Sequence, residues 1–262
     1  MNKAQLKRAV DILVDAWQIG NPITALPEEC CPKTAKEGMQ IQDALAEALG
    51  FEIGGWKIGC TSDYAQKLLK TDGPFAGRVF ATRMFPSGTK FGGSAYRMRG
   101  LEGEFAFVLG KNLKPRKRPY TRAEVRAAVA EVRPVVELVD SRFLDWMTVN
   151  TPSLIADMGC NAALIVGAPI KRWKSTDLTK AAVRMKVDGK VVGQGKGADA
   201  LGDPFLALTW LANELRDREG LKAGQIVSTG TCTGFYKAEP AAKVVADFGK
   251  LGKVAFEMIK VG

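Results

Sequence analysis

Histidine is absent from this sequence of 262 residues. Without an imidazole, the chain cannot form a Ser-His-Asp or Cys-His catalytic arrangement, a histidine-ligated metal site or a histidine general base. Proton transfers must instead use Glu, Asp, Lys, Tyr, Cys or bound water. The absence therefore directs the search for a functional site toward carboxylates and lysines.

Cysteine pairs with zinc-type spacing and apolar runs of membrane length are missing as well. The cysteines are odd in number and none has the spacing of a zinc motif, so we expect reduced thiols at Cys30, Cys31, Cys60, Cys160 and Cys232. No uninterrupted apolar stretch approaches a membrane span, and the first residues lack a signal-peptide core. We therefore expect a cytoplasmic protein with no membrane partner.

The charge balance is strongly basic, with a formal net charge of +10 at pH 7. This charge permits nucleic-acid binding, but a general attraction for small anionic substrates explains it equally well. The sequence has no basic motif interleaved with aromatic residues, as nucleic-acid readers have. We predict a small-molecule partner and no nucleic-acid partner.

Apolar periodicity predicts helices first and then mostly strands. Helices are expected at residues 3–20, 34–49, 63–70, 121–132 and 204–218. Strands are expected at 54–62, 101–110, 133–142, 162–166, 183–187, 225–229, 243–248 and 254–259. This order is typical of an α+β protein whose β part closes into a roll or barrel. We expect one catalytic domain over 1–262, mainly helical in 1–75 and a β-roll with inserted helices in 76–262.

Two glutamates mark the strand at 101–110. Because side chains alternate faces along a strand, Glu102 and Glu104 point the same way while Phe105 and Phe107 point into apolar packing. Two carboxylates this close repel unless a proton or a cation lies between them, and oxygen ligands suit a hard ion such as Mg²⁺ or Mn²⁺. The alternative is a solvated strand face with two unrelated glutamates.

A third carboxylate, Glu137, lies among Val and Leu in the strand at 133–142, where an unpaired charge is costly. If the two strands are neighbours, Glu102, Glu104 and Glu137 form a three-carboxylate metal site. The alternative is an ordinary buried ion pair of Glu137 with Arg133 or Arg142.

Lys57 is a single basic residue in a short strand bounded by glycines. A partly buried ammonium near a carboxylate site can bind a substrate carboxylate or transfer a proton. The alternative is a lysine whose head extends to solvent. Further along the chain, Phe143, Trp146 and Met147 are expected to be pocket or interface hydrophobics.

These motifs together resemble one known family. The resemblance rests on residues 55–62 (GWKIGCTS), on Glu102-Gly103-Glu104, on residues 137–142 (ELVDSR), on 201–204 with 210–213, and on 229–231 with 246–252. In this order they resemble the 2-keto-4-pentenoate hydratase and 4-oxalocrotonate decarboxylase family, within the fumarylacetoacetate hydrolase superfamily. The resemblance runs nearly end to end.

The resemblance implies a mixed β-roll with a helical N-terminal part, and a homo-oligomer. It implies Mg²⁺ or Mn²⁺ held by Glu102, Glu104 and Glu137, with Lys57 near the reacting end of a 2-oxo acid substrate. It places substrate contacts at Ser62, Phe75, Arg142, Asp157 and Cys160. The superfamily's carbon–carbon hydrolases use a histidine dyad, so the absence of histidine argues against that activity.

Two positions depart from the family pattern. Phe75 stands where hydratases of the family usually have Asp, and Cys160 stands where a substrate-contacting serine is expected. An apolar ring cannot take up a proton, so Phe75 favours decarboxylation over hydration. We therefore expect a metal-dependent lyase that decarboxylates or hydrates an unsaturated 2-oxo acid or dicarboxylate in the degradation of aromatic compounds.

The sequence also leaves open a function of a different class. The chain could keep the fold and the metal site as a non-catalytic partner subunit, since family decarboxylases associate with hydratases. By analogy, a hydratase or decarboxylase partner is therefore a further expectation beside the homo-oligomer.

Overall fold

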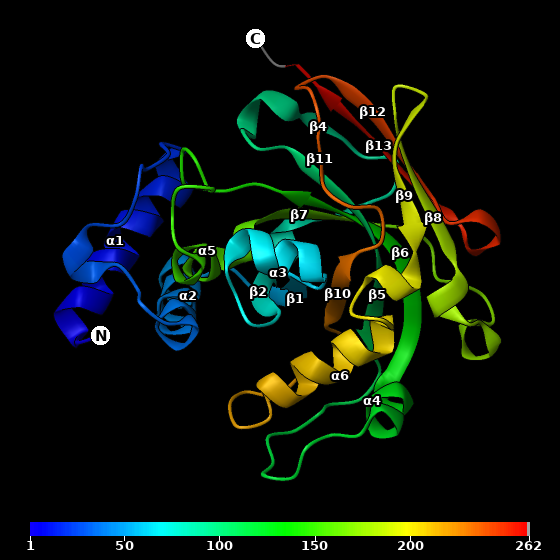
Figure 1. Ribbon diagram of the computed structural model, residues 1–262, viewed down its shortest axis with the longest axis horizontal. Coiled ribbons are helices and arrows are strands. Elements are labelled where there is room, and N and C mark those ends of the chain that lie inside the picture. The colour runs from blue at the N-terminus through cyan, green and yellow to red at the C-terminus, as the bar shows by residue number, and fades with distance from the viewer. Residues whose placement is uncertain (261–262) are drawn as a thin grey trace.

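Two β-sheets organise the protein, as Figure 1 shows for the computed structural model, which describes residues 1–260. The larger sheet has the strand order β2-β1-β10-β5-β6-β7-β3, and β11 pairs with β5. Its strands are β1 (Ile53–Gly59), β2 (Phe75–Phe80), β3 (Met84–Pro86), β5 (Gly100–Leu109), β6 (Val129–Val139), β7 (Asn161–Val166), β10 (Ile226–Thr231) and β11 (Tyr236–Lys237).

The smaller sheet has the order β4-β13-β12-β8-β9 and lies at the upper right of Figure 1. Its strands are β4 (Lys90–Gly92), β8 (Ala182–Val187), β9 (Lys190–Lys196), β12 (Ala242–Asp247) and β13 (Lys253–Ile259). β8 and β9 form the hairpin that the Asp188-Gly189 turn predicts, and both residues have positive φ. Helices and a curled mixed sheet confirm the predicted fold class.

Two groups of helices cover different parts of the larger sheet (Figure 1). α1 (Lys3–Ile19), α2 (Ala35–Leu49) and α5 (Thr151–Ala156) pack together at one side, while α4 (Arg122–Ala128) and α6 (Pro204–Glu214) pack together at another. α1 begins at a capping box of Asn2 and Gln5 and ends at Gly20, and α2 begins at the cap of Thr34. The short α3 (Asp63–Leu69) follows β1.

Strand β5 runs through the middle of the larger sheet and separates two kinds of surroundings. Leu101, Phe105 and Phe107 are fully buried in the main core, and Phe105 and Phe107 contact Phe248 and Phe205, respectively. The side chains at even-numbered positions, which include Glu102 and Glu104, lie on the opposite face of the strand. The predicted alternation of apolar and acidic residues along this strand is confirmed, and it positions the site.

Two predicted helices end earlier in the structure than expected. The capping box of Thr121 and Glu124 is present, but α4 ends at Ala128 instead of continuing to 132, because residues 129–132 pair with β5. Sheet pairing that buries Val129 and Val132 overrides their helical periodicity. Similarly, α6 ends at Glu214, before the predicted 218. β1, within the part expected to be mainly helical, belongs to the larger sheet.

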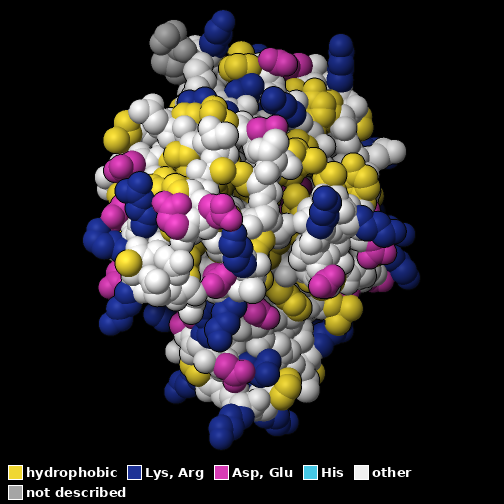
Figure 2. All heavy atoms as spheres, turned by 60° about the vertical axis from the view of Figure 1, so that its left-hand side comes forward, with side chains coloured by type: hydrophobic (Ala, Val, Ile, Leu, Met, Phe, Trp, Pro, Cys, Tyr) yellow, Lys and Arg dark blue, Asp and Glu magenta, His cyan; other side chains and the backbone are white. Residues whose placement is uncertain are grey.

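The sequence argues against a membrane partner and against a nucleic-acid partner. The helices and the surface bear on these two expectations. None of the helices within residues 1–260 combines the length and the apolar character needed to cross a membrane. On the face that Figure 2 shows, Lys and Arg side chains lie scattered, with Asp and Glu among them. This face therefore carries no continuous basic stripe of the kind that tracks a nucleic-acid backbone.

Candidate metal centre and its cavity

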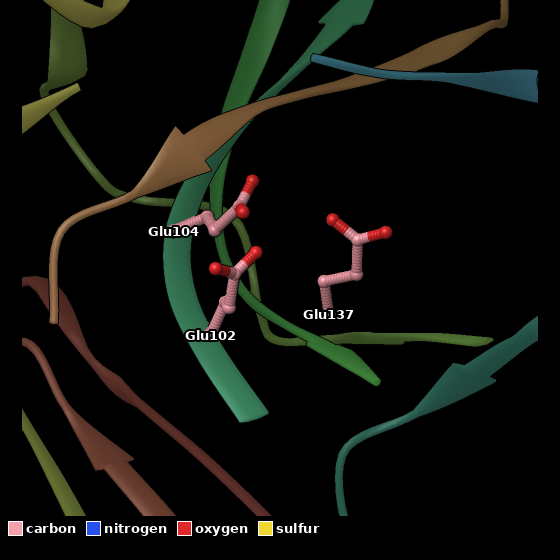
Figure 3. Close-up of side chains that lie close together, drawn as sticks. All are labelled: Glu102, Glu104 and Glu137. Carbon is pink, nitrogen blue, oxygen red and sulfur yellow. The ribbon is translucent and has the colours of Figure 1, made fainter. Parts of the chain in front are cut away.

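Three glutamates from neighbouring strands bring their carboxylates together. Glu102 and Glu104 lie on the same face of β5, and antiparallel pairing places Glu137 of β6 directly opposite Glu102. One oxygen from each carboxylate lies within 4.8 Å of the other two. Figure 3 shows the three carboxyl groups pointing toward the same space. The strand register thus brings the three predicted metal ligands together.

Strand β10 holds Glu104 from the other side. The Ser228 hydroxyl and the Gly230 amide both donate to Oε2 of Glu104, the amide at 2.8 Å. The Glu104 side chain is fully buried, and no residue within 1–260 donates to its Oε1. One oxygen is therefore fixed by the sheet, and the other is available to a cation.

Glu137 has a cation beside it. Nζ of Lys57 lies 3.6 Å from Oε1 of Glu137, and the Asn161 amide donates to the same oxygen at 2.9 Å. Glu137 is fully buried, and across the described part of the chain its Oε2 has no hydrogen-bond partner. Glu137 therefore resembles Glu104: one oxygen is held and the other is left without a partner.

The alternative ion pairs of Glu137 are wrong. Arg133 pairs with Glu131 at 2.6 Å, and Arg142 pairs with Asp157. Both guanidinium groups are therefore committed to other carboxylates. Glu137 pairs with neither arginine. It forms a cluster of three carboxylates with Glu102 and Glu104, called the acidic cluster from here on.

Burial raises the pKa of all three carboxyl groups, and repulsion by a neighbouring carboxylate adds to this effect at Glu102 and Glu104. Burial, with the neighbouring charge of Glu137, raises the pKa of Glu102 to about 7. Burial and the charges of Glu137 and Glu102 hold the pKa of Glu104 well above its usual range. Burial also raises the pKa of Glu137, against the opposing effect of Lys57. A cation among these oxygens would relieve this repulsion.

The donor set fits a hard divalent cation. It consists of carboxylate oxygens from three strand-held side chains, which are the ligands that Mg²⁺, Mn²⁺ and Ca²⁺ prefer. Two of the buried oxygens, Glu104 Oε1 and Glu137 Oε2, have no partner among residues 1–260. Since buried polar atoms are rarely left unpaired, these oxygens are expected to have a ligand.

Lys57 does not extend to solvent. It is 3% exposed, so the alternative of a solvated head is wrong. Burial alone would lower the pKa of Lys57, but the charges of Glu137 and Glu102 outweigh that effect and raise it. The ammonium therefore stays charged and offsets part of the negative charge of the cluster.

A cavity of about 440 Å³ opens onto this cluster, and both Lys57 and Glu102 line it. Much of the rest of the lining comes from α3, from the loop before α5 and from the loop after β10, and β2, β6 and α5 each add a residue. Trp146 and Met147 line the cavity as expected of pocket hydrophobics, whereas Phe143 is 2% exposed and does not line it.

Three predicted substrate contacts, Ser62, Phe75 and Cys160, line this cavity. The centroid of the Phe75 ring lies 5.4 Å from Nζ of Lys57. The Ser62 hydroxyl caps α3 by accepting from the Ala65 amide at 3.2 Å. Burial raises the pKa of the Cys160 thiol to about 12, so the thiol is neutral at pH 7. Contact of these residues with a substrate stays a prediction.

The other two predicted substrate contacts, Arg142 and Asp157, face each other instead of the cavity. Asp157 is fully buried and accepts from the guanidinium and from the backbone amide of Arg142. Arg142 also donates to the carbonyl oxygen of Asn161 at 3.1 Å, and the Asn161 side chain holds Glu137. The pair therefore supports the metal centre from behind, and a substrate contact for it stays a prediction.

Sequence reasoning did not single out Asn161, Ser228 or Phe235. Asn161 and Ser228 hydrogen-bond the acidic cluster, and Phe235 lines the cavity. Each lies in a segment remote in sequence from the glutamates. Only the strand pairing reveals their roles, although Asn161 falls within the stretch 157–162, in which the resemblance had already drawn attention to Cys160.

The fold and the site define a class of protein: a curled mixed sheet that carries three clustered carboxylates able to hold a divalent cation, beside a cavity. The fumarylacetoacetate (FAA) hydrolase C-terminal family matches residues 90–258, the segment that contains Glu102, Glu104 and Glu137. The chain belongs to the fumarylacetoacetate hydrolase family, as the resemblance predicted.

Two relatives and a solved structure match this chain over most of its length. A 2-keto-4-pentenoate hydratase of Burkholderia vietnamiensis is 32% identical over 92% of this chain and 93% of that protein. A 2-hydroxyhexa-2,4-dienoate hydratase of Comamonas testosteroni is 34% identical over 71% of each. The 4-oxalocrotonate decarboxylase of Pseudomonas putida, solved with magnesium and adipate, is 25% identical with a TM-score of 0.90 over 99% of both chains. The relatives named here are enzymes, and the decarboxylase holds a divalent cation in its crystal.

Proposed function

We propose that this chain is a divalent-metal-dependent lyase that decarboxylates or hydrates an unsaturated 2-oxo acid in the degradation of aromatic compounds. One observation carries the proposal. Three carboxylates with two partnerless buried oxygens meet a buried lysine at a cavity. The names of the relatives, hydratases and a decarboxylase, support the same class of reaction.

Each part of the site has a chemical task in this proposal. Glu102, Glu104 and Glu137 would hold Mg²⁺ or Mn²⁺. When bound, the ion would supply a Lewis acid that stabilises the negative charge developing on the keto oxygen of the substrate. The remaining steps fall to side chains of this chain.

Lys57 is the proposed catalytic residue. Its charged ammonium borders the cavity 3.6 Å from Glu137, where it can bind the substrate carboxylate or transfer a proton. Phe75 and Cys160 present neutral surface next to it. They would limit the access of water to the reacting end of the substrate.

The Glu104→Gln variant tests the metal site. The amide keeps the shape of the side chain but removes its charge, so we expect Mg²⁺-dependent binding of pyruvate to weaken by at least about 100-fold, as expected for loss of a charged ligand. Isothermal titration calorimetry measures this change. Glu131→Gln is the matched control, because Glu131 lies on β6 and pairs with Arg133 away from the cluster. Titrations of Glu104→Gln that match the wild type would contradict the proposal.

Proton NMR of the purified protein distinguishes the possible reactions. The substrates are 2-oxohex-3-enedioate and 2-hydroxypenta-2,4-dienoate, each with Mg²⁺ and with an EDTA control. Metal-dependent loss of a carboxyl group identifies a decarboxylase, and metal-dependent addition of water identifies a hydratase. If neither substrate changes with this single component, the alternative of a non-catalytic partner subunit gains support, and copurification with a hydratase or decarboxylase tests it.

A further inference from the structure

The cavity indicates what kind of substrate the site accepts. We infer that the substrate has an uncharged, apolar tail, and that the cavity discriminates against a 2-oxo acid whose tail ends in a second carboxylate. This inference rests on the proposed function, because it assumes that the carboxylate and keto group of a 2-oxo acid occupy the end near Glu102 and Lys57.

Charge is confined to one end of the cavity. Among the described residues that line it, Lys57 is the only Lys or Arg and Glu102 the only Asp or Glu, and both lie at the end assigned to the head group of the 2-oxo acid. A second carboxylate further along would lose its hydration without gaining a cation. That loss is costly in apolar surroundings.

The lining between that end and the solvent is mainly apolar, and it also carries the uncharged hydroxyl groups of Ser62, Tyr64 and Thr231. Met98 and Leu154 are buried deep in the cavity wall, and Leu68, Met147 and Phe235 are 40–49% exposed at its mouth. These side chains come from separate segments of the chain, so the apolar surface is a property of the fold. The Trp146 and Phe235 rings lie 6.2 Å apart between their centroids and add aromatic surface to the mouth.

The volume of the cavity is also larger than the carboxylate and keto group of a 2-oxo acid would fill. Its volume of about 440 Å³ lies within the range of roughly 300–1,000 Å³ that holds drug-sized ligands. A water molecule occupies about 30 Å³ in the liquid, so pyruvate would leave most of this space to water. Filling it with alkyl or aryl groups would release that water from apolar walls.

Three cations lie close by but outside the cavity. Arg97 and Lys237 line a neighbouring hollow that shares Met98, Trp146 and Phe235 with it. Lys70 lines a second hollow, which shares Leu68, Leu69 and Met147 with the cavity. They are the side chains that a tail carboxylate could seek, so their removal belongs in the test.

The inference has a consequence for the reaction. A tail without a second carboxylate has no distal carboxyl group to lose, so an apolar tail favours hydration over decarboxylation. This reverses the order that Phe75 suggested from the sequence. It also separates this chain from the solved decarboxylase, whose crystal contains the dicarboxylate adipate.

The experiment compares ligands that share a head group and differ in the tail. With Mg²⁺ present, calorimetry measures the binding of pyruvate, of 2-oxoadipate and of 6-methyl-2-oxoheptanoate, in which two methyl groups replace the distal carboxylate oxygens. We expect the apolar ligand to bind at least about tenfold more tightly than 2-oxoadipate. Along straight-chain 2-oxo acids, affinity should rise about threefold to fourfold per buried methylene.

The outcomes separate the inference from the proposed function. If pyruvate binds with Mg²⁺ and 2-oxoadipate binds as tightly as its apolar counterpart or more tightly, the inference is overturned and the proposed function stands. If pyruvate does not bind even with Mg²⁺, the proposed function fails and the inference falls with it. Removing Arg97, Lys237 or Lys70 (R97M, K237M, K70M) should leave the ratio of the two affinities unchanged, and a change would show that a tail carboxylate reaches one of them.

A charge added at the mouth provides a gain-of-binding test. Met147 is 49% exposed, so Met147→Lys should fold, and we expect it to improve the affinity for 2-oxoadipate relative to that for pyruvate about tenfold. Leu206→Lys is the matched control, because Leu206 is 46% exposed on α6 and does not line the cavity. Equal effects of the two variants on 2-oxoadipate would contradict the inference.

Discussion

Lys57 shows how a single residue depends on its surroundings for its chemistry. A lysine that is 3% exposed would ordinarily tend to lose its proton, yet the charges of Glu137 and Glu102 raise the pKa of Lys57 instead. The lysine and the glutamates therefore stabilise each other's charged forms. Removing the lysine would leave the carboxylates with less compensation and would raise the pKa of Glu137 and Glu102 further.

The Lys57→Met variant tests this role at the residue scale. Met keeps the apolar stem and removes the charge, so we expect kcat to fall by at least about 100-fold, the lower limit for losing a group that transfers protons. Circular dichroism should stay unchanged. Lys67→Met is the control, since Lys67 is exposed on α3 and does not line the cavity. Full activity of Lys57→Met would mean that the lysine takes no part in the reaction.

At the residue scale, the sequence predicted the charged groups of the site better than their partners. Glu102 and Glu104 follow from the two-residue repeat of a strand, and Glu137 follows from the cost of an isolated charge among apolar residues. Asn161 and Ser228 could not be predicted in this way. Their side chains are ordinary polar groups, and their contacts with the cluster arise only when remote strands pair.

At the scale of elements, the register of β5, β6 and β10 determines the geometry of the centre. β6 places Glu137 opposite Glu102, and an irregularity in β10 between Ser228 and Thr231 turns the Gly230 amide toward Glu104. Gly230 has a φ of 98°, and a Cβ there would lie 2.1 Å from Oγ1 of Thr61. Both observations require glycine at this position.

The Gly230→Ala variant tests this requirement. The strained φ and the contact with Thr61 should lower the free energy of unfolding by about 1–3 kcal/mol, and the displaced amide should weaken Mg²⁺-dependent pyruvate binding. Urea unfolding and calorimetry measure the two effects. Gly224→Ala is the matched control, because Gly224 has a φ of 88° but open space around it. We expect Gly224→Ala to lose stability alone, and loss of metal-dependent binding in both variants would contradict the role of the Gly230 amide.

The same scale shows why some element boundaries were predicted and others were not. The start of α4 follows from local chemistry, because Thr121 and Glu124 hydrogen-bond within one turn. Its end depends on β5, which is remote in sequence and pairs with residues from Val129 onward. Caps and turns are encoded locally, whereas the change from helix to strand is decided by tertiary pairing.

At the scale of the whole molecule, the fold buries acidic groups that the unfolded chain would expose to water. The carboxyl group of Glu102 has an ordinary pKa near 4.5, and the folded protein raises it to about 7. Between these two pH values the folded state holds a proton that the unfolded state has lost. The stability contributed by this proton is complete below the lower value and is lost as pH rises through about 7.

A divalent cation should exchange with these protons, which makes binding depend on pH. We expect Mg²⁺ affinity to rise between about pH 6 and about pH 8, with protons released on binding, because the ion needs the ionised carboxylates. Over the same range the melting temperature of the metal-free protein should fall, and Mg²⁺ should restore it. Calorimetry in buffers of different protonation enthalpy counts the protons, and scanning calorimetry follows melting. The Glu104→Gln variant should show no Mg²⁺-dependent recovery. Equal Mg²⁺ affinity at both pH values, without buffer dependence, would mean that the three carboxyl groups are already ionised in the metal-free protein.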